Sequence, residues 1–171
     1  KWVRQANQII YRMANEKPEC MGMGTTMTFL YFMDKHAMLA HVGDSRCYRI
    51  RDGRIMQLTK DHSLVAELVR IGEITPEQAR NHPYRNIITR ALGTDDYVAV
   101  DAQDIPVEEN DVYLLCSDGL SNYLEEDELL HAVQTQPSDA LCDHLVQIAL
   151  DRGGRDNITV VAAYCGGEVA R

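Results

Sequence analysis

The sequence lacks the patterns that mark several large protein classes. No apolar run approaches the roughly 18 residues of a membrane span, and no signal-peptide pattern opens the chain. There is no CxxC pair, no GxGxxG loop and no GxxxxGK[ST] loop, which disfavours a zinc knuckle and the common nucleotide-binding folds. We therefore expect a cytoplasmic protein with no membrane contact within this chain.

Basic residues are also scarce. Seventeen Lys and Arg stand against 26 Asp and Glu, which gives a net charge of -9, and a surface of this sign repels nucleic acids and anionic membranes. The five cysteines are odd in number and widely scattered, so a disulfide framework is not indicated. The excess of carboxylates instead suits a protein that binds cations.

The 171 residues, 45% of them hydrophobic, are enough for one domain with a substantial core. Strand-like runs occupy 25–34, 36–45, 97–105, 111–118 and 157–165, and Asp52-Gly53 predicts a hairpin between two more strands within 46–58. Helical patterns occupy the first 13 residues, 125–134 and 138–151, and a helical insertion covers 61–92 with a last segment at 83–93. Strands grouped in hairpins predict an α+β fold, with antiparallel sheets and helices packed outside them.

The beginning of the chain has two unusual features. Its first residue is Lys1 instead of Met, and no capping residue precedes the first helical pattern. We interpret the sequence as a fragment of a chain that continues upstream.

Three aspartates share one kind of position. Asp44 and Asp118 each follow a strand, and Asp156 immediately precedes the last strand. Each one alone is most simply a turn or a strand-end cap. Strand ends can converge on one point, however, and carboxylate oxygens without His or Cys nearby select Mg²⁺ or Mn²⁺ rather than Zn²⁺.

Several ordered segments carry a resemblance to a known family. They are GMGTTMTFLYF, AHVGDSRCYRIRDGRIMQLTKDHS, HPYRNIITRALG, LLCSDGLSNYL and GGRDNITVV, and they span about residues 22–161. Together they resemble the metal-dependent Ser/Thr protein phosphatases of the PP2C (PPM) type, in their bacterial version. The resemblance implies a four-layer α-β-β-α sandwich with its N-terminal strands missing here, a single domain over 1–171, and a flap at about 61–92.

The resemblance also implies a metal site. Asp118 and Asp156 resemble ligands of a centre of two Mg²⁺ or Mn²⁺ ions, and Asp44 resembles a ligand of a third ion. We expect Gly119 to let the backbone turn away without a Cβ clash, and Asn157 and Ser45 to serve as supporting or turn residues. A water activated by two metals would then hydrolyse phosphoserine and phosphothreonine in proteins, without a cysteine or serine nucleophile.

Other family features bear on activity and partners. Candidates for substrate contact in the flap are His62, His82, Arg85 and Arg90. The family's phosphate-binding arginine, first bridging aspartate and general-acid histidine would lie upstream, so we expect the natural protein to be a phosphatase and this fragment to be inactive. The implied partners are Ser/Thr-phosphorylated proteins, including a eukaryotic-like Ser/Thr kinase.

Two alternatives stay open. One is a pseudophosphatase or regulatory module that binds a phosphoprotein without hydrolysing it. The other is a cysteine phosphatase, since Cys165 and Arg171 satisfy the C-x₅-R spacing. That loop needs its arginine at the start of a following helix, and the chain ends at Arg171, so chance explains the spacing better.

Overall fold

The computed structural model describes residues 2–166. The chain divides into two compact units. The first contains the residues through Met33, together with Ala37–Asp44 and Asp61–Ile105, and the second contains Asp34–His36, Ser45–Lys60 and the residues from Pro106 onward. Among the described residues, no helix is both long and apolar enough to cross a membrane.

The first unit is built on a three-stranded sheet and a long helix. Helix α1 (Trp2–Glu16) and the short helix η1 (Pro18–Cys20) precede the sheet, whose strand order is β1-β2-β5, with β1 at Met27–Met33, β2 at His36–Val42 and β5 at Asp101–Pro106. Val3 and Ile10 of α1 pack against a buried cluster that includes Val42 and Leu92. The apolar face of this helix is buried only in part, because Trp2 and Ile9 of the same helix are 75% and 60% exposed.

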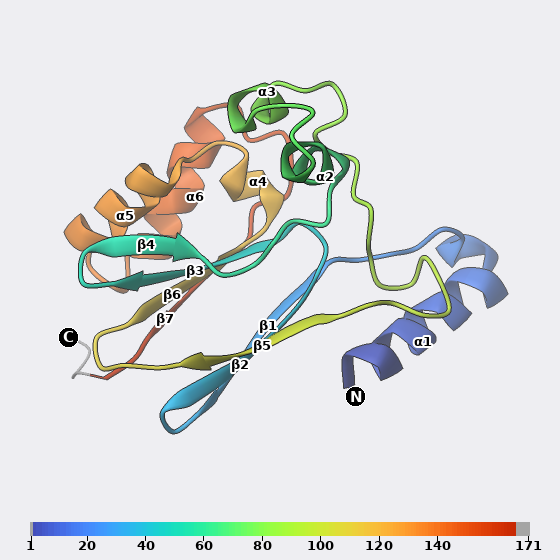
Figure 1. Ribbon diagram of the computed structural model, residues 1–171, viewed down its shortest axis with the longest axis horizontal. Helices are drawn as coiled ribbons and strands as arrows, with labels where there is room; N and C mark the ends of the chain where they lie inside the picture. The colour runs from blue at the N-terminus through green and yellow to red at the C-terminus, as the bar shows by residue number, and fades with distance from the viewer. Residues whose placement is uncertain (1, 167–171) are drawn as a thin grey trace. The chain divides into compact units, whose positions relative to one another are not determined.

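Helix α1 lies beside the loop that leads into β5 (Figure 1), and a buried amide side chain joins the two. Asn7 is 1% exposed, and its side-chain nitrogen donates to the carbonyl oxygens of Asp95 and Asp96 at 3.0 and 3.2 Å. Its side-chain oxygen accepts the Gly93 N–H at 2.8 Å. Every polar atom of this buried side chain thus has a partner, as burial requires.

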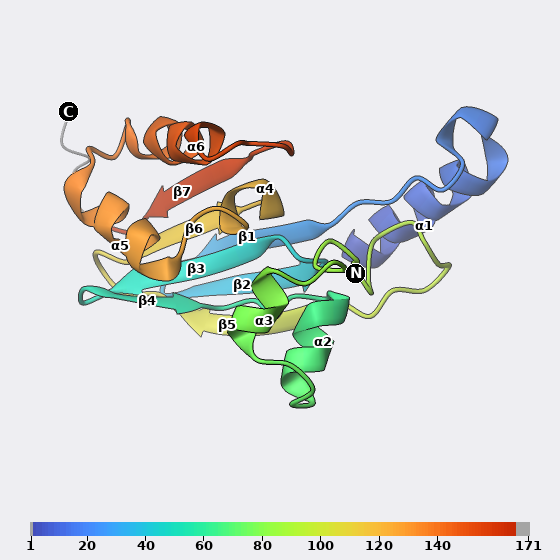
Figure 2. The ribbon, with the colours of Figure 1, turned by 90° about the horizontal axis from the view of Figure 1, so that it is seen from above.

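The flap segment contains two short helices, α2 (Leu64–Arg70) and α3 (Pro76–Arg80), which lie beside each other (Figure 2). Thr75 caps α3, because its side chain accepts the Gln78 N–H while the Gln78 side chain accepts the Thr75 N–H. The predicted helical segment at 83–93 is wrong. Its backbone pairs with distant residues instead, since the Leu92 N–H donates to the Thr25 carbonyl at 2.8 Å, and this long-range pairing overrides local helical periodicity.

The second unit contains a four-stranded antiparallel sheet in the order β4-β3-β6-β7. Its strands are β3 (Arg46–Arg51), β4 (Arg54–Gln57), β6 (Val112–Cys116) and β7 (Val160–Tyr164). The predicted hairpin is confirmed: Asp52 and Gly53 have φ angles of 49° and 69°, and Arg51 pairs with Arg54. A two-residue turn with both φ values positive matches the twist of the flanking strands.

Three helices cover one face of this sheet (Figure 1): α4 (Asp118–Ser121), α5 (Glu126–Thr135) and α6 (Leu141–Asp151). Tyr48 and Leu114 of the sheet lie in one buried cluster with Leu129 of α5 and Leu145 of α6. The sequence did not predict α4, which begins within the strand-end motif. The predicted α+β class, two antiparallel sheets with flanking helices, is confirmed.

A buried ion pair fixes the connection between β5 and β6. Asp111 is 0% exposed, and its two carboxylate oxygens each accept a hydrogen bond of 2.6 Å from the Arg51 guanidinium. The Tyr113 hydroxyl donates to the same carboxylate at 3.1 Å. Burial alone would raise the pKa of Asp111, but these hydrogen bonds outweigh it and hold the pKa below its ordinary value.

Candidate metal centre

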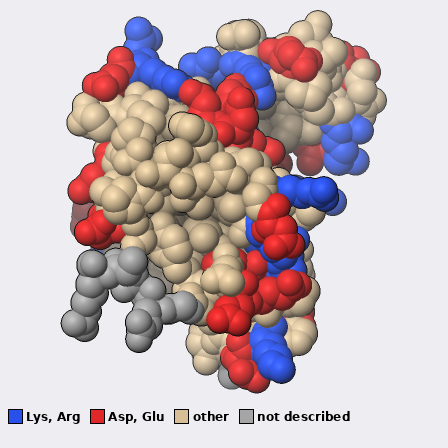
Figure 3. All heavy atoms as spheres, turned by 90° about the vertical axis from the view of Figure 1, so that its left-hand side faces the viewer, with Lys and Arg blue, Asp and Glu red and all other residues tan. Residues whose placement is uncertain are grey.

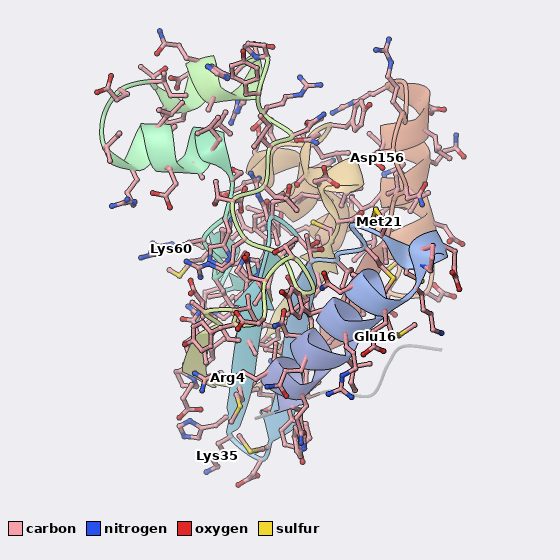
Figure 4. All side chains as sticks on the ribbon, turned by 90° about the vertical axis from the view of Figure 1, so that its right-hand side faces the viewer. Arg4, Glu16, Met21, Lys35, Lys60 and Asp156 are labelled. Atoms are coloured by element: carbon pink, nitrogen blue, oxygen red, sulfur yellow. The ribbon has the colours of Figure 1, made fainter. Side chains whose placement is uncertain are left out.

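The pairing of β6 with β7 brings Asp118 and Asp156 to the same end of the second sheet. Cys116 pairs with Val160, and the ladder continues through Ser117, whose N–H donates to the Thr159 carbonyl at 3.1 Å. Asp118 is the next residue and opens α4. Asp156 lies on the loop between α6 and β7 (Figure 4).

The backbones of the two segments are in contact at Gly119. A Cβ atom on this residue would lie 2.4 Å from the Asn157 carbonyl oxygen, so only glycine fits. Gly119 lies in α4 and does not have a left-handed φ. The predicted need for a glycine is therefore right, but its cause is a close approach between segments rather than a turn.

Ser117 is a residue of this site that the sequence reading missed. Its hydroxyl donates to the Asn157 carbonyl at 3.1 Å and accepts the Thr159 N–H at 3.0 Å. The Asn157 N–H in turn donates to the Asp156 carboxylate at 2.7 Å. A serine directly before the aspartate is the only sequence signal of this role, and a serine in that place is common at helix N-termini.

The two carboxylates repel each other. Asp118 is half-buried, and its pKa is raised first by this burial and then by the negative charge of Asp156. The Gly119 N–H and the positive charge of Arg46 act in the opposite direction without cancelling the shift. The site thus holds negative charge that the protein neutralises only in part, and a bound cation would relieve it.

These residues fit a divalent cation as part of its ligand set. Carboxylate oxygens are the donors that Mg²⁺ and Mn²⁺ prefer, and no His or Cys ligand is implied by the motifs. Across residues 2–166, no group of three or more His, Cys, Asp or Glu side chains is arranged to hold a metal. What the second unit supplies is a carboxylate pair.

The remaining candidate, Asp44, belongs to the first unit, whereas its neighbour Ser45 belongs to the second. Asp44 is half-buried and follows Gly43, whose φ of +113° only glycine adopts readily. The roles of Asp44 and Ser45 stay predictions.

The flap candidates differ in exposure. His62 is 5% exposed, and its ring nitrogens face the Gly43 N–H at 2.9 Å and the Asp101 carboxylate at 3.1 Å. Arg90 donates to the same carboxylate at 2.8 Å. A direct substrate contact is therefore not supported for His62, an internal side chain, while contacts by the half-buried His82 and the exposed Arg85 stay predictions.

The surroundings of Cys165 disfavour this residue as a nucleophile. Burial, and after it the negative charge of Asp111, raises the pKa of its thiol, whereas a nucleophilic cysteine needs a lowered pKa. Arg171, the other residue of the C-x₅-R spacing, lies outside the described residues.

Comparison with known families and proteins gives a consistent result. The family model described as protein phosphatase 2C matches residues 3–158. The chain is 41% identical over 162 residues to the serine/threonine phosphatase stp of Listeria welshimeri, covering 94% of this chain and 64% of that protein. It is 42% identical over 161 residues to the serine/threonine protein phosphatase PstP of Mycobacterium tuberculosis H37Rv, again covering 94% of this chain but 31% of that protein.

Solved structures agree. The serine/threonine phosphatase Stp1 from Staphylococcus aureus matches with a TM-score of 0.91 and 40% identity, covering 96% of this chain and 65% of that one. The catalytic domain of the serine threonine protein phosphatase PstP in complex with two manganese ions matches with a TM-score of 0.86 and 39% identity, covering 95% and 68%. The chain thus spans about a third to two thirds of the length of these relatives.

Proposed function

Because the chain belongs to the protein phosphatase 2C family, we propose that the natural protein hydrolyses phosphoserine and phosphothreonine in other proteins with the help of Mg²⁺ or Mn²⁺. The observation that carries this proposal is the pair of carboxylates, Asp118 and Asp156, at the same end of the second sheet. Burial, and after it the negative charge of Asp156, raises the pKa of Asp118, and a bound cation would offset that negative charge. The manganese ions of the structure related to this chain support the choice of metal.

In this proposal Asp118 and Asp156 would hold the ions of a two-metal centre, and Asp44 would hold a third. When bound, such ions supply positive charge that favours deprotonation of water and offsets the charge of the phosphoryl oxygens. The protein's part is positioning. The Asn157 N–H orients the Asp156 carboxylate, and Ser117 fixes the Asn157 carbonyl at the close contact with Gly119.

We propose further that both units belong to one catalytic domain and that residues of about 61–92 act as its substrate flap. The substrates would be Ser/Thr-phosphorylated proteins, among them a eukaryotic-like Ser/Thr kinase, in the cytoplasm. Nucleic acid is not expected as a partner. The net charge is -9, and on the face shown in Figure 3 basic side chains are interspersed with acidic ones.

The 171 residues by themselves are proposed to be inactive. A bridged pair of divalent ions needs more anionic ligands than the two carboxylates that the second unit supplies. Expression of this chain alone and of the natural protein, followed by a side-by-side assay, tests this point. Metal-dependent turnover by the 171-residue chain would contradict it.

The main experiment measures hydrolysis of p-nitrophenyl phosphate and of a phosphothreonine peptide by the natural protein with Mn²⁺, with chelator, and with Asp118→Asn. We expect activity that chelator abolishes and that the substitution lowers about 100-fold or more. Asp143→Asn, on the exposed side of α6, is the matched control and should keep full activity. Metal-independent activity would refute the proposal, and binding of phosphopeptide without turnover would favour a pseudophosphatase.

A further inference from the structure

Gly43, the residue before Asp44, is bonded to His62 at both polar groups of its backbone. One bond is made by the His62 side chain and the other by the His62 main chain. The Gly43 N–H donates to His62 Nδ1 at 2.9 Å, and the His62 N–H donates to the Gly43 carbonyl at 2.8 Å. Gly43 also packs so closely on Thr26 that a Cβ atom would lie 2.4 Å from the threonine Cγ2. The backbone that carries Asp44 therefore has little freedom to shift at this point.

The second nitrogen of the same ring faces the end of the flap. Because Nδ1 accepts the Gly43 N–H, the neutral ring carries its proton on Nε2, 3.1 Å from Oδ2 of Asp101. Arg90 donates to Oδ1 of Asp101 at 2.8 Å, and its Nη1 lies 2.9 Å from Nε2, so the Asp101 carboxylate lies next to both donors. The ring thus lies between the Gly43 backbone and the Asp101–Arg90 pair.

The main chain of His62 also closes the base of the flap. The Thr89 N–H donates to the His62 carbonyl at 2.8 Å, and the Leu64 N–H donates to the Ile87 carbonyl at 2.9 Å. His41 stacks on the His62 ring with centroids 4.8 Å apart. The two ends of the flap and the backbone preceding Asp44 therefore meet at one buried residue, His62, inside the first unit.

We propose that His62 is a positioning residue, which orients the Asp44 carboxylate through the Nδ1 bond to Gly43 and fastens the flap through the Nε2 bond to Asp101. The inference rests on the proposed function, because it gives Asp44 a metal to hold. A backbone clamped in this way limits where the Cα atom of the next residue, Asp44, can lie, and with it the position from which the carboxylate extends. Loss of such a supporting contact typically lowers metal affinity or activity about 10- to 100-fold.

Two substitutions separate the two bonds. In His62→Asn the amide oxygen occupies the place of Nδ1 and can accept the Gly43 N–H, but the side chain no longer reaches Asp101. In His62→Gln the amide nitrogen occupies the place of Nε2 and can donate to Asp101, but Gly43 loses its acceptor. Asp101→Asn keeps the whole ring, and His131→Gln, exposed on α5, is the control for histidine replacement.

Three readouts are taken on the natural protein: hydrogen exchange of the Gly43 amide without metal, Mn²⁺ binding by electron paramagnetic resonance of free Mn²⁺, and the Mn²⁺ dependence of phosphopeptide hydrolysis. We expect His62→Gln to speed Gly43 exchange and to weaken the Mn²⁺ dependence about tenfold or more. His62→Asn and Asp101→Asn should leave the exchange rate of the Gly43 amide and the Mn²⁺ dependence close to those of the wild type. They should instead speed exchange of the flap amides.

The outcomes separate this inference from the proposed function. If the wild type binds Mn²⁺ and turns over, but His62→Gln and His62→Asn behave alike, the side chain serves only packing and the inference is wrong. The inference is also wrong if a folded His62→Gln protein shows the same Mn²⁺ dependence of phosphopeptide hydrolysis as the wild type. A wild type with no Mn²⁺ binding refutes the proposed function and the link to Asp44 together, while Gly43 exchange still reports whether His62 holds the backbone.

Discussion

The contact between Gly119 and Asn157 leads to the sharpest prediction for the metal centre. Gly119→Ala would place a methyl carbon 2.4 Å from the Asn157 carbonyl oxygen and 3.0 Å from its carbonyl carbon. Both partners are backbone atoms, so no flexible side chain can rotate away. The segment from Asp156 to Asn157 must instead move by about 1 Å to restore ordinary van der Waals contact.

The magnitude follows from the cost of this movement. Forcing a methyl group into a packed region costs typically about 1–3 kcal/mol, and here the movement also strains the hydrogen bond of Ser117 to the Asn157 carbonyl. A loss of about 2 kcal/mol lowers the Tm of a chain of this size by roughly 4–8 °C. Because the Asp156 carboxylate is held by the Asn157 N–H, we also expect about tenfold weaker Mn²⁺ binding.

Calorimetry and Mn²⁺ titration of the Gly119→Ala protein measure the two effects. The control is Gly72→Ala in the flap, where φ is +79° and nothing lies within 4 Å of the added carbon. The control should lose about 1 kcal/mol to backbone strain alone and keep its Mn²⁺ affinity. Wild-type Mn²⁺ affinity in a folded Gly119→Ala protein would refute the argument that this contact sets the carboxylate pair.

Three further predictions concern stability and thiol chemistry. Asp111→Ala leaves the Arg51 guanidinium without its buried partner, so urea denaturation should show a loss of about 3 kcal/mol; a loss under 1 kcal/mol would contradict this. Hydrogen bonds from Arg152 and from a backbone N–H lower the pKa of Glu128 to about 2, against 4.5 ordinarily. The ionised Glu128 therefore stabilises the folded state by about 1 kcal/mol at most. This contribution is lost as the pH falls from 4.5 to 2. Glu128→Gln should flatten the Tm across that window, and an unchanged pH profile would refute the pairing. Burial and a neighbouring thiol raise the pKa of Cys47 to about 12, so mass spectrometry should find it alkylated by iodoacetamide more slowly than the half-buried cysteines.

Local patterns in the sequence were sufficient where neighbouring residues decide the structure. Asp52-Gly53 predicts a two-residue hairpin because few other dipeptides tolerate two positive φ angles, and the observed angles are 49° and 69°. The helix predicted at 138–151 forms at Leu141–Asp151, because its apolar residues recur on one face and that face is buried against the sheet. Periodicity failed at 83–93, where remote backbone partners decide the conformation.

In the candidate site, too, local motifs identify some features and the packing of distant segments decides the others. The motifs around Asp118 and Asp156 identify both carboxylates as candidates, and their residue types limit the cation to a hard one. Their proximity follows from the β6–β7 register, which aligns Cys116 with Val160 and thereby brings Gly119 against Asn157. No local pattern encodes which residues of two distant strands lie opposite each other.

By itself, the sequence determined the fold class, the family and the residue types that can hold a metal, because each depends on composition, periodicity or contiguous motifs. The tertiary structure alone decided that Gly119 answers a backbone contact, that Ser117 supports Asn157, and that His62 is an internal residue bonded to Gly43. The physical reason is that hydrogen bonds and close approaches between segments depend on strand register and burial, which arise only when distant parts of the chain pack together.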